Sequence, residues 1–216
     1  MKDSIKLKPN CQNLSDNNTL IQICGGIAAG KTTLASLFLN QATQVFEDFK
    51  RSPFWEAFYL YPGKYIFETE ISFILLHYHQ IKKAIEHEQL NLICDFSFLL
   101  DLAYAKIGLS GSQLKAFEGV LNEIRNELPA PDLYIYLDCD AKTQLDRIRS
   151  RQRPEESLIT IDFLESLNAA LKFEIDKVDA IKVITINSAE RDFAHIESVQ
   201  LEMIDLVKSA LPKQDS

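Results

Sequence analysis

The stretch ICGGIAAGKTT, residues 23–33, follows a short apolar run and places three glycines before a lysine and two threonines. Residues 19–24, TLIQIC, are typical of a buried strand. From residue 31 onward, KTTLASLFLNQA carries apolar side chains at helical spacing. The glycines therefore belong to a tight loop that joins a strand to a helix, and this loop decides the fold class.

From Gly25 to Thr32 the loop matches the P-loop pattern, in which a second glycine is followed by lysine and then serine or threonine. In such a loop successive backbone N–H groups point at phosphate oxygens, and the next helix begins with partial positive charge. We expect Lys31 to reach the outer phosphates and the Thr32 hydroxyl to ligate Mg²⁺. The residues predicted to bind the nucleotide, ATP, are Gly25, Gly26, Ile27, Ala28, Ala29, Gly30, Lys31, Thr32 and Thr33.

Two further classes of nucleotide-binding protein fit this loop less well. A dinucleotide-binding G-x-G-x-x-G loop is excluded because position 27 is isoleucine. A GTPase is disfavoured, since the chain has no DxxG motif and its nearest match to NKxD, at 176–179, ends a predicted helix. The remaining alternative is a glycine turn that only joins a strand to a helix.

The composition limits the classes of partner. The chain has 216 residues, of which 46% are apolar and 25% charged, and its formal net charge is −8. This acidity argues against a groove for a nucleic acid polymer, because polyanion binding needs a basic surface. No apolar run approaches the length of about 20 residues that spans a membrane. The four cysteines are far apart and lack a CxxC pair, which is typical of reduced packing residues in a cytoplasmic protein.

Strand-like and helical segments alternate along the chain. The expected strands cover residues 19–24, 43–47, 90–95, 132–138 and 180–187. The expected helices cover 31–42, 53–62, 64–88, 98–107, 111–127, 141–150, 160–177 and 192–209. This alternation predicts an α/β protein with the three-layer P-loop NTPase fold, in which helices flank a parallel sheet of about five strands. We expect a mobile tail at 1–18 and a single domain at 19–212.

An arginine-rich segment, DRIRSRQRPEES, covers residues 146–157. Arg147 and Arg151 are four residues apart and share a helix face. We expect a lid at about 147–157 that folds over the triphosphate, with Arg151 and Arg153 holding the nucleotide and Arg147 and Arg151 neutralising charge during transfer. The alternative is a solvated helix end whose arginines pair with Glu155 and Glu156.

Together these motifs resemble the deoxynucleoside kinase family, especially its bacterial deoxyadenosine/deoxyguanosine kinase branch, from about residue 20 to about 175. The loop GGIAAGKTT resembles the family's phosphate loop, and PFWEAFYLYPGKYIFETEISF resembles its NPYLEDFYKDPKRWAFQTQIYF. The stretch RQRPEES resembles the lid motif RxRxEE, and FLLDLAYAKIG resembles the helix after the Asp-Arg-Ser motif. The resemblance implies Mg-ATP-dependent phosphorylation of the 5′-hydroxyl of a nucleoside by a homodimer, with the helix at 64–88 available for dimer packing.

The resemblance assigns roles to several side chains. Glu47 takes the proton from the 5′-hydroxyl, Tyr59 and Glu156 hold the 3′-hydroxyl, and Glu68 faces the nucleobase. From the residues alone, Glu47 is expected at the carboxyl end of a strand as a general base, the alternative being a surface acid beside Asp48. Asp95 also ends a predicted strand, where it would support Mg²⁺ or cap the following helix. Lys31, Arg147 and Arg151 complete the predicted catalytic set.

Two positions depart from the family pattern. Glu68 stands where the family has glutamine, and an ionised carboxylate only accepts hydrogen bonds. It would therefore accept hydrogen bonds from the N–H donors of guanine, or else pair with a cation and make no contact with the nucleobase.

Phe96 replaces the arginine of Asp-Arg-Ser, which lies by the 5′-hydroxyl in the family. Loss of such a charge costs about a hundredfold or more in rate. Lys50 or Arg51 could compensate. Otherwise the substrate is unusual, the activity weak, or the chain a nucleotide-binding subunit without catalysis. A kinase of another small molecule is a further alternative.

Aromatic and histidine side chains on the predicted helices carry weaker signals. Trp55, Phe58 and Phe67 could wall a nucleobase, although core packing accounts for each of them equally well. The three histidines of the long helix lack metal-ligand spacing and are expected to be structural or surface residues: His77, His79 and His87.

Overall fold

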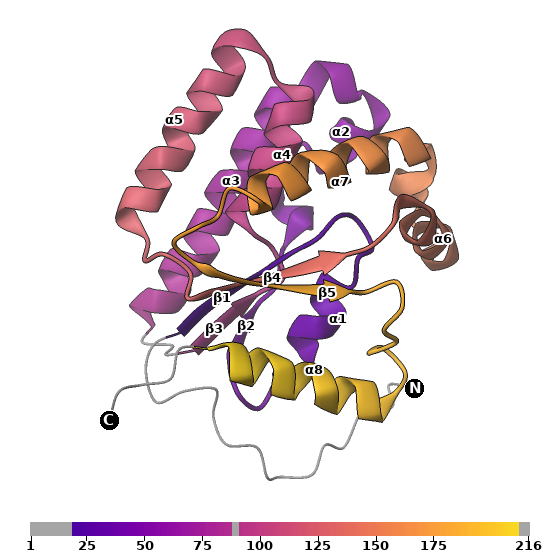
Figure 1. Cartoon of the computed structure of the whole chain (residues 1–216). Helices are drawn as coiled ribbons and strands as arrows, with labels where there is room; N and C mark the ends of the chain where they lie inside the picture. Colours follow the sequence, from indigo (N-terminus) through magenta and orange to yellow (C-terminus); the bar gives the residue numbers. More distant parts are fainter. Residues whose placement is uncertain (1–18, 88–90, 212–216) are drawn as a thin grey trace.

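A five-stranded parallel sheet forms the centre of the molecule (Figure 1). The computed structural model describes residues 19–87 and 91–211, so the tail predicted at 1–18 lies outside the described residues. The strands are β1 (Thr19–Cys24), β2 (Thr43–Val45), β3 (Asn91–Cys94), β4 (Leu133–Asp138) and β5 (Lys182–Asn187), and their order in the sheet is β2-β3-β1-β4-β5. This arrangement confirms the predicted three-layer α/β fold.

Helices cover both faces of the sheet (Figure 1). One face carries α3 (Pro62–Glu86), α4 (Phe98–Gly108), α5 (Gly111–Glu127) and α7 (Ile161–Ile175). The other face carries α1 (Lys31–Ser36) and α8 (Glu197–Ala210). The remaining helical elements are η1 (Phe49–Arg51), α2 (Trp55–Leu60), α6 (Ala141–Arg151) and η2 (Pro154–Leu158). None of the helices described within 19–87 and 91–211 is long and apolar enough to cross a membrane.

The three central strands β1, β3 and β4 are largely apolar on both sides because helices cover both faces of the sheet. Along β1, Ile21 and Ile23 pack with α1 and α8, whereas Leu20 packs with α3 and α5. Cys24 points to the side of α4 and α7. It is buried and unpaired, as are Cys94 and Cys139, in agreement with the packing role predicted for cysteines.

Local hydrogen bonds explain where two helices differ from their predicted bounds. The first helix ends at Ser36 because Leu37 and Phe38 donate to carbonyl groups only three residues back, at 3.1 Å each, which tightens the chain into turns. The last helix begins at Glu197 rather than 192, since the Asp192 carboxylate accepts a hydrogen bond from the backbone of His195 at 3.1 Å. Residues 192–196, which were predicted to be helical, lie outside the helix, and residues 189–195 form a loop.

Candidate active site

A cavity of about 810 Å³ opens where several strands end. Its walls come from the P-loop after β1, the segment after β2, α3, α4, the arginine-rich segment and the loop after β5. In a parallel sheet all carboxyl strand ends lie at the same edge, which brings these segments together although they are far apart in sequence.

The P-loop forms one wall of this cavity. Ile27, Ala28, Gly30, Lys31, Thr32 and Thr33 line it, whereas Gly25, Gly26 and Ala29 do not. Gly30 has φ of 101°, and a side chain there would meet the Phe193 ring at 3.0 Å, so both conformation and space favour glycine. The Lys31 amine donates to the carbonyl oxygens of Gly25 and Gly26 at 2.9 and 3.0 Å, which folds it over the loop.

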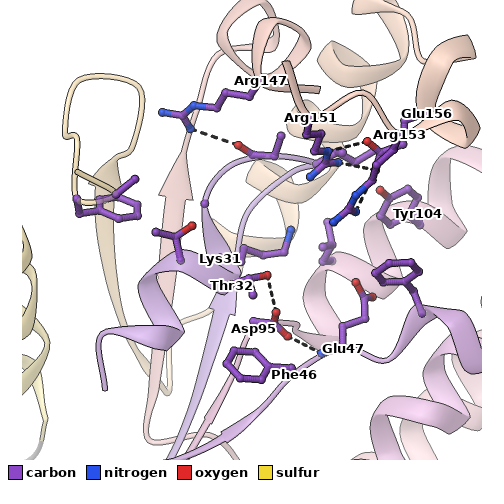
Figure 2. A pocket seen from close by; sticks show the side chains of 18 of the residues that line it. Lys31, Thr32, Phe46, Glu47, Asp95, Tyr104, Arg147, Arg151, Arg153 and Glu156 are labelled. Atoms are coloured by element: carbon purple, nitrogen blue, oxygen red, sulfur yellow. Dashed lines mark hydrogen bonds and ion pairs between the residues drawn. The ribbon is translucent and has the colours of Figure 1, made fainter. Parts of the chain in front are cut away.

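Asp95 connects the P-loop to the segment after β2 (Figure 2). Its carboxylate accepts hydrogen bonds from the Thr32 hydroxyl and from the Glu47 backbone N–H, both at 2.6 Å. Helix α4 is capped instead by Ser97, whose hydroxyl accepts from the backbone of Leu100 at 3.2 Å. The alternative that Asp95 caps this helix is therefore wrong. A hydroxyl beside a carboxylate fits Mg²⁺, which prefers oxygen ligands and few protein carboxylates.

Glu47 lies on the cavity wall with its side chain half buried. Burial favours the neutral acid, but the hydrogen bond and charge of His77, with the charges of Lys31 and Arg153, hold the pKa of the carboxyl below its ordinary value. The neighbouring Asp48 instead forms an ion pair with Arg51 at 2.7 Å. Glu47 is thus an ionised carboxylate in the cavity, which is the form that a general base requires.

The arginine-rich segment contributes three arginines to the cavity (Figure 2). The Arg151 guanidinium donates to both carboxylate oxygens of the buried Glu156, at 2.6 and 2.5 Å. Arg153 lies 3.5 Å from the same carboxylate. Arg147 donates instead to the carbonyl oxygens of Ala28, at 3.3 Å, and Ser188, at 2.6 Å, and so connects the P-loop to the end of β5. The alternative of pairing with an acidic residue is thus present at Glu156, and Arg147 contacts the P-loop, whereas closure of the segment as a lid stays a prediction.

Two residues predicted to face the substrate lie elsewhere. Glu68 is exposed and does not line the cavity, whereas Glu70 does. Phe96 is 1% exposed and stacks on the His77 ring, with centroids 4.0 Å apart, so it belongs to the packing behind the cavity. The side chain of Tyr59, like that of Phe58, lies outside the described part of the structure.

Most of the residues predicted to supply a compensating cation or an apolar wall also lie outside the cavity. Lys50 and Arg51 do not line the cavity. Of the aromatic candidates, Trp55 lines it, whereas Phe67 packs against the core formed by α3, α4 and α5.

Sequence reasoning missed several cavity residues on α3 and α4. Glu70 and Phe73 on α3 line the cavity together with Asp101 and Tyr104 on α4. Glu70, Phe73 and His77 are spaced by three and four residues, which places them on one helix face. That spacing is a usable signal, but only after it is known which face of α3 points inward. The loop at 189–195 was missed because it was predicted to begin a helix.

Residues 21–212 match the sequence profile of the deoxynucleoside kinase family. This chain belongs to that family. Deoxyguanosine kinase of Bacillus subtilis (strain 168) is 28% identical over 185 residues, which are 80% of this chain and 88% of the relative. Deoxyadenosine kinase of Dictyostelium discoideum is 32% identical over 190 residues, which are 84% of this chain and 77% of the relative.

A solved structure shows the same fold. Deoxyadenosine kinase from M. mycoides, with its products dCMP and dCDP bound, gives a TM-score of 0.75 at 25% identity. The match covers 88% of this chain and 98% of the other. The chain is accordingly a nucleoside kinase, a phosphotransferase that binds a nucleoside and a nucleoside triphosphate.

Proposed function

We propose that this kinase transfers the γ-phosphoryl group of ATP to the 5′-hydroxyl of a purine deoxynucleoside. The observation that carries the proposal is that Lys31 and Thr32 of the P-loop share one cavity with the ionised Glu47. A phosphate-binding loop and a general base must meet in one enclosed space for direct transfer between two bound molecules.

On the donor side, the backbone N–H groups of the P-loop and the Lys31 amine would bind the β- and γ-phosphates. Thr32 and Asp95 would hold Mg²⁺, which neutralises phosphate charge when it is bound. Arg151 and Arg153 are the mobile charges in this proposal. When the segment at 147–157 closes as a lid, they would break their ion pairs with Glu156 and bind phosphate oxygens instead. Arg147 would hold the P-loop in place.

On the acceptor side, Glu47 would accept the proton of the 5′-hydroxyl as its oxygen attacks the γ-phosphorus. The bond from the γ-phosphorus to the bridging oxygen breaks, ADP leaves, and the products are a nucleoside 5′-monophosphate and a protonated Glu47. A second role is left for Glu156. Once its arginines turn to phosphate, its carboxylate is free to bind the 3′-hydroxyl, as the family resemblance implies, together with Tyr59.

Glu70 is the residue that we assign to the nucleobase, in place of Glu68. Burial raises the pKa of Glu70 well above its ordinary value, and the charges of Asp101 and Glu47 raise it further, although His77 opposes them. A neutral carboxyl donates one hydrogen bond and accepts another, so it matches the donor and acceptor pairs on the edge of adenine or guanine. The names of the curated relatives, deoxyguanosine kinase and deoxyadenosine kinase, support a purine.

A substrate panel tests the proposal. The purified protein would be incubated with Mg-ATP and each of the common deoxynucleosides and ribonucleosides, and the monophosphates would be quantified by chromatography. We expect the highest turnover with deoxyguanosine or deoxyadenosine. Preference for a pyrimidine would refute the purine preference, and absence of any product with ATP bound would refute nucleoside phosphorylation.

We further propose that the protein acts in nucleotide salvage as a cytoplasmic homodimer. The buried, unpaired cysteines support a reducing compartment. Leu75 and Ile85 on α3 leave apolar surface exposed, which supports packing between two copies. Light scattering coupled to gel filtration would give twice the monomer mass if this is correct, and the monomer mass if it is wrong.

A further inference from the structure

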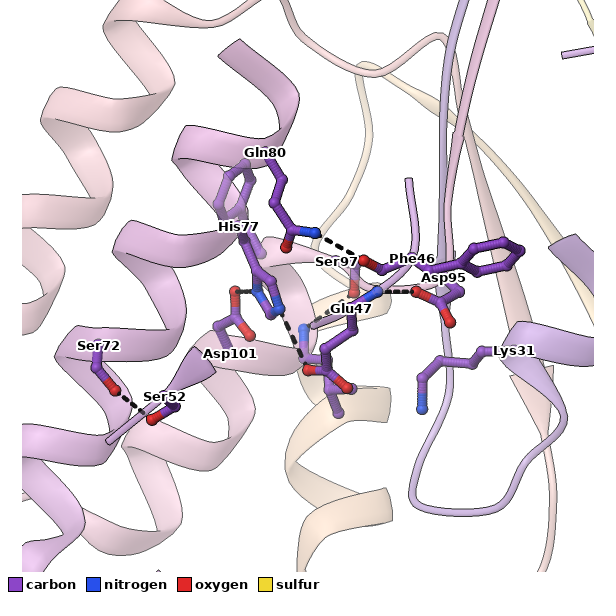
Figure 3. Close-up of polar contacts among 12 residues, drawn as sticks. Lys31, Phe46, Glu47, Ser52, Ser72, His77, Gln80, Asp95, Ser97 and Asp101 are labelled. Carbon is purple, nitrogen blue, oxygen red and sulfur yellow. Dashed lines mark hydrogen bonds and ion pairs between the residues drawn. The ribbon is translucent and has the colours of Figure 1, made fainter. Parts of the chain in front are cut away.

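His77 lies between two carboxylates behind the cavity (Figure 3). Its side chain is 1% exposed. Nδ1 lies 2.8 Å from the Asp101 carboxylate, and Nε2 lies 3.2 Å from the Glu47 carboxylate. A neutral imidazole donates from one nitrogen only, whereas the imidazolium donates from both. The geometry on both sides therefore fits a charged ring that bridges α4 to the segment after β2.

The charges around the ring favour this form. Burial alone lowers the pKa of His77, but Asp101 and Glu47 together raise it to about 10. Glu70, on the same helix, is the third carboxyl that interacts with the ring. The positive charges of Lys31 and Arg153 act on the Glu47 carboxylate.

Phe96 fixes the plane of the ring. The two rings are stacked with an interplanar angle of 7° and centroids 4.0 Å apart. Phe96 occupies the position at which the family resemblance leads us to expect an arginine beside the general base. Arg51, one candidate for compensation, is engaged by Asp48 on the surface. Among the residues that the structure describes, the cationic side chain with a hydrogen bond to Glu47 is that of His77.

We propose that His77 is a positioning residue for phosphoryl transfer: its charged ring, held by Asp101 and stacked on Phe96, orients the Glu47 carboxylate in place of an arginine at position 96. This inference rests on the proposed role of Glu47. It explains why the arginine can be absent from a chain that keeps the rest of the site. It also predicts that an arginine at 96 and the imidazolium at 77 are alternatives, because both would place a cation against the same carboxylate.

A double-mutant cycle tests this exchange. We expect His77→Gln to lower kcat by about tenfold to a hundredfold, because a misplaced base loses much of its effect, while KM for ATP stays within about twofold. Phe96→Arg should also lower kcat, since two cations then compete for one buried place. The combined His77→Gln/Phe96→Arg variant should recover most of the loss seen in His77→Gln. A purely structural histidine would give no such recovery.

His79→Gln is the matched control, because His79 lies on the same helix but is exposed and outside the cavity. It should keep wild-type kcat. If the wild type is active and His77→Gln retains more than half of its kcat, the inference is wrong. If His77→Gln is slow and the combined variant is no faster, the exchange with arginine is also wrong.

A spectroscopic measurement separates this inference from the proposed function. In ¹⁵N NMR of the wild-type protein at neutral pH, both ring nitrogens of His77 should carry protons, and the Glu47→Gln variant should alter the Nε2 signal more than the Nδ1 signal. This result does not depend on turnover. A neutral ring would overturn the inference even in an active enzyme. An inactive enzyme with a charged, bridging ring would overturn the proposed function and leave the bridge in place.

Discussion

Replacement of Glu47 by glutamine should nearly abolish phosphoryl transfer while it leaves the fold intact. The amide is close to the carboxylate in shape. Its oxygen can still accept the hydrogen bond from His77, whose Nε2 lies 3.2 Å from the Glu47 carboxylate in the wild type. The backbone N–H of residue 47 would still donate to Asp95, because this contact does not involve the side chain. What disappears is the negative charge and the capacity to take a proton.

The expected loss follows from that capacity. General base catalysis contributes about a hundredfold to ten-thousandfold, and the amide cannot supply it. We therefore expect kcat for Glu47→Gln to fall by about that factor, with KM for ATP changed by less than about threefold, since Lys31 and Thr32 are untouched. The assay is ADP release coupled to a reporter enzyme, with monophosphate confirmed by chromatography.

The matched control is Asp48→Asn, which changes the adjacent acid and its surface ion pair with Arg51. Surface ion pairs of this kind contribute little to stability, so its kcat should stay close to that of the wild type. A Glu47→Gln enzyme within about threefold of wild-type kcat would refute the assignment of Glu47 as general base. Equal losses in both variants would show that the acidic segment, not this carboxylate, matters.

Further variants probe other parts of the site. Lys31→Ala should abolish measurable transfer and weaken ATP binding in calorimetry, and full activity would exclude the P-loop as the donor site. Glu70→Gln should keep purine turnover, because an amide donates and accepts hydrogen bonds as a neutral carboxyl does, whereas Glu70→Ala should lose it. Glu68→Gln, which changes an exposed residue, should match the wild type. A change of preferred nucleobase in Glu70→Gln would indicate that Glu70 is ionised. The raised pKa of His77 contributes stability that is fully present below its ordinary pKa of 6.5 and is lost as pH rises through about 10, so the Tm difference between the wild type and His77→Gln should shrink over that range. A difference that is constant with pH would contradict a charged His77.

The features that the sequence predicts well are those encoded within a few residues. The P-loop pattern fixes a strand, a turn and a helix start, because Gly30 must adopt a backbone conformation that other residues avoid. The spacing of Arg147 and Arg151 likewise places both arginines at the cavity. The alternation of strands with helices predicts the parallel sheet, because the connection between two parallel strands usually contains a helix.

The features that the sequence predicts poorly depend on which helix face points inward. Glu68 and Glu70 are two positions apart, so they lie on nearly opposite sides of α3, and the choice between them decides which one meets the substrate. His77 has no motif of its own. Its role depends on Asp101 and Glu47, which come from two other segments and meet it only in the folded chain.

In the proposed reaction, the 5′-hydroxyl of a purine deoxynucleoside receives the γ-phosphoryl group of ATP. The most direct test is transfer of label from ATP marked in its γ-phosphate to deoxyguanosine and to 2′,5′-dideoxyguanosine, which differs only by lacking the 5′-hydroxyl. We expect a labelled monophosphate from deoxyguanosine and none from the analogue, although the analogue should bind and inhibit. Label on the analogue, or a failure to label deoxyguanosine and deoxyadenosine alike, would contradict it.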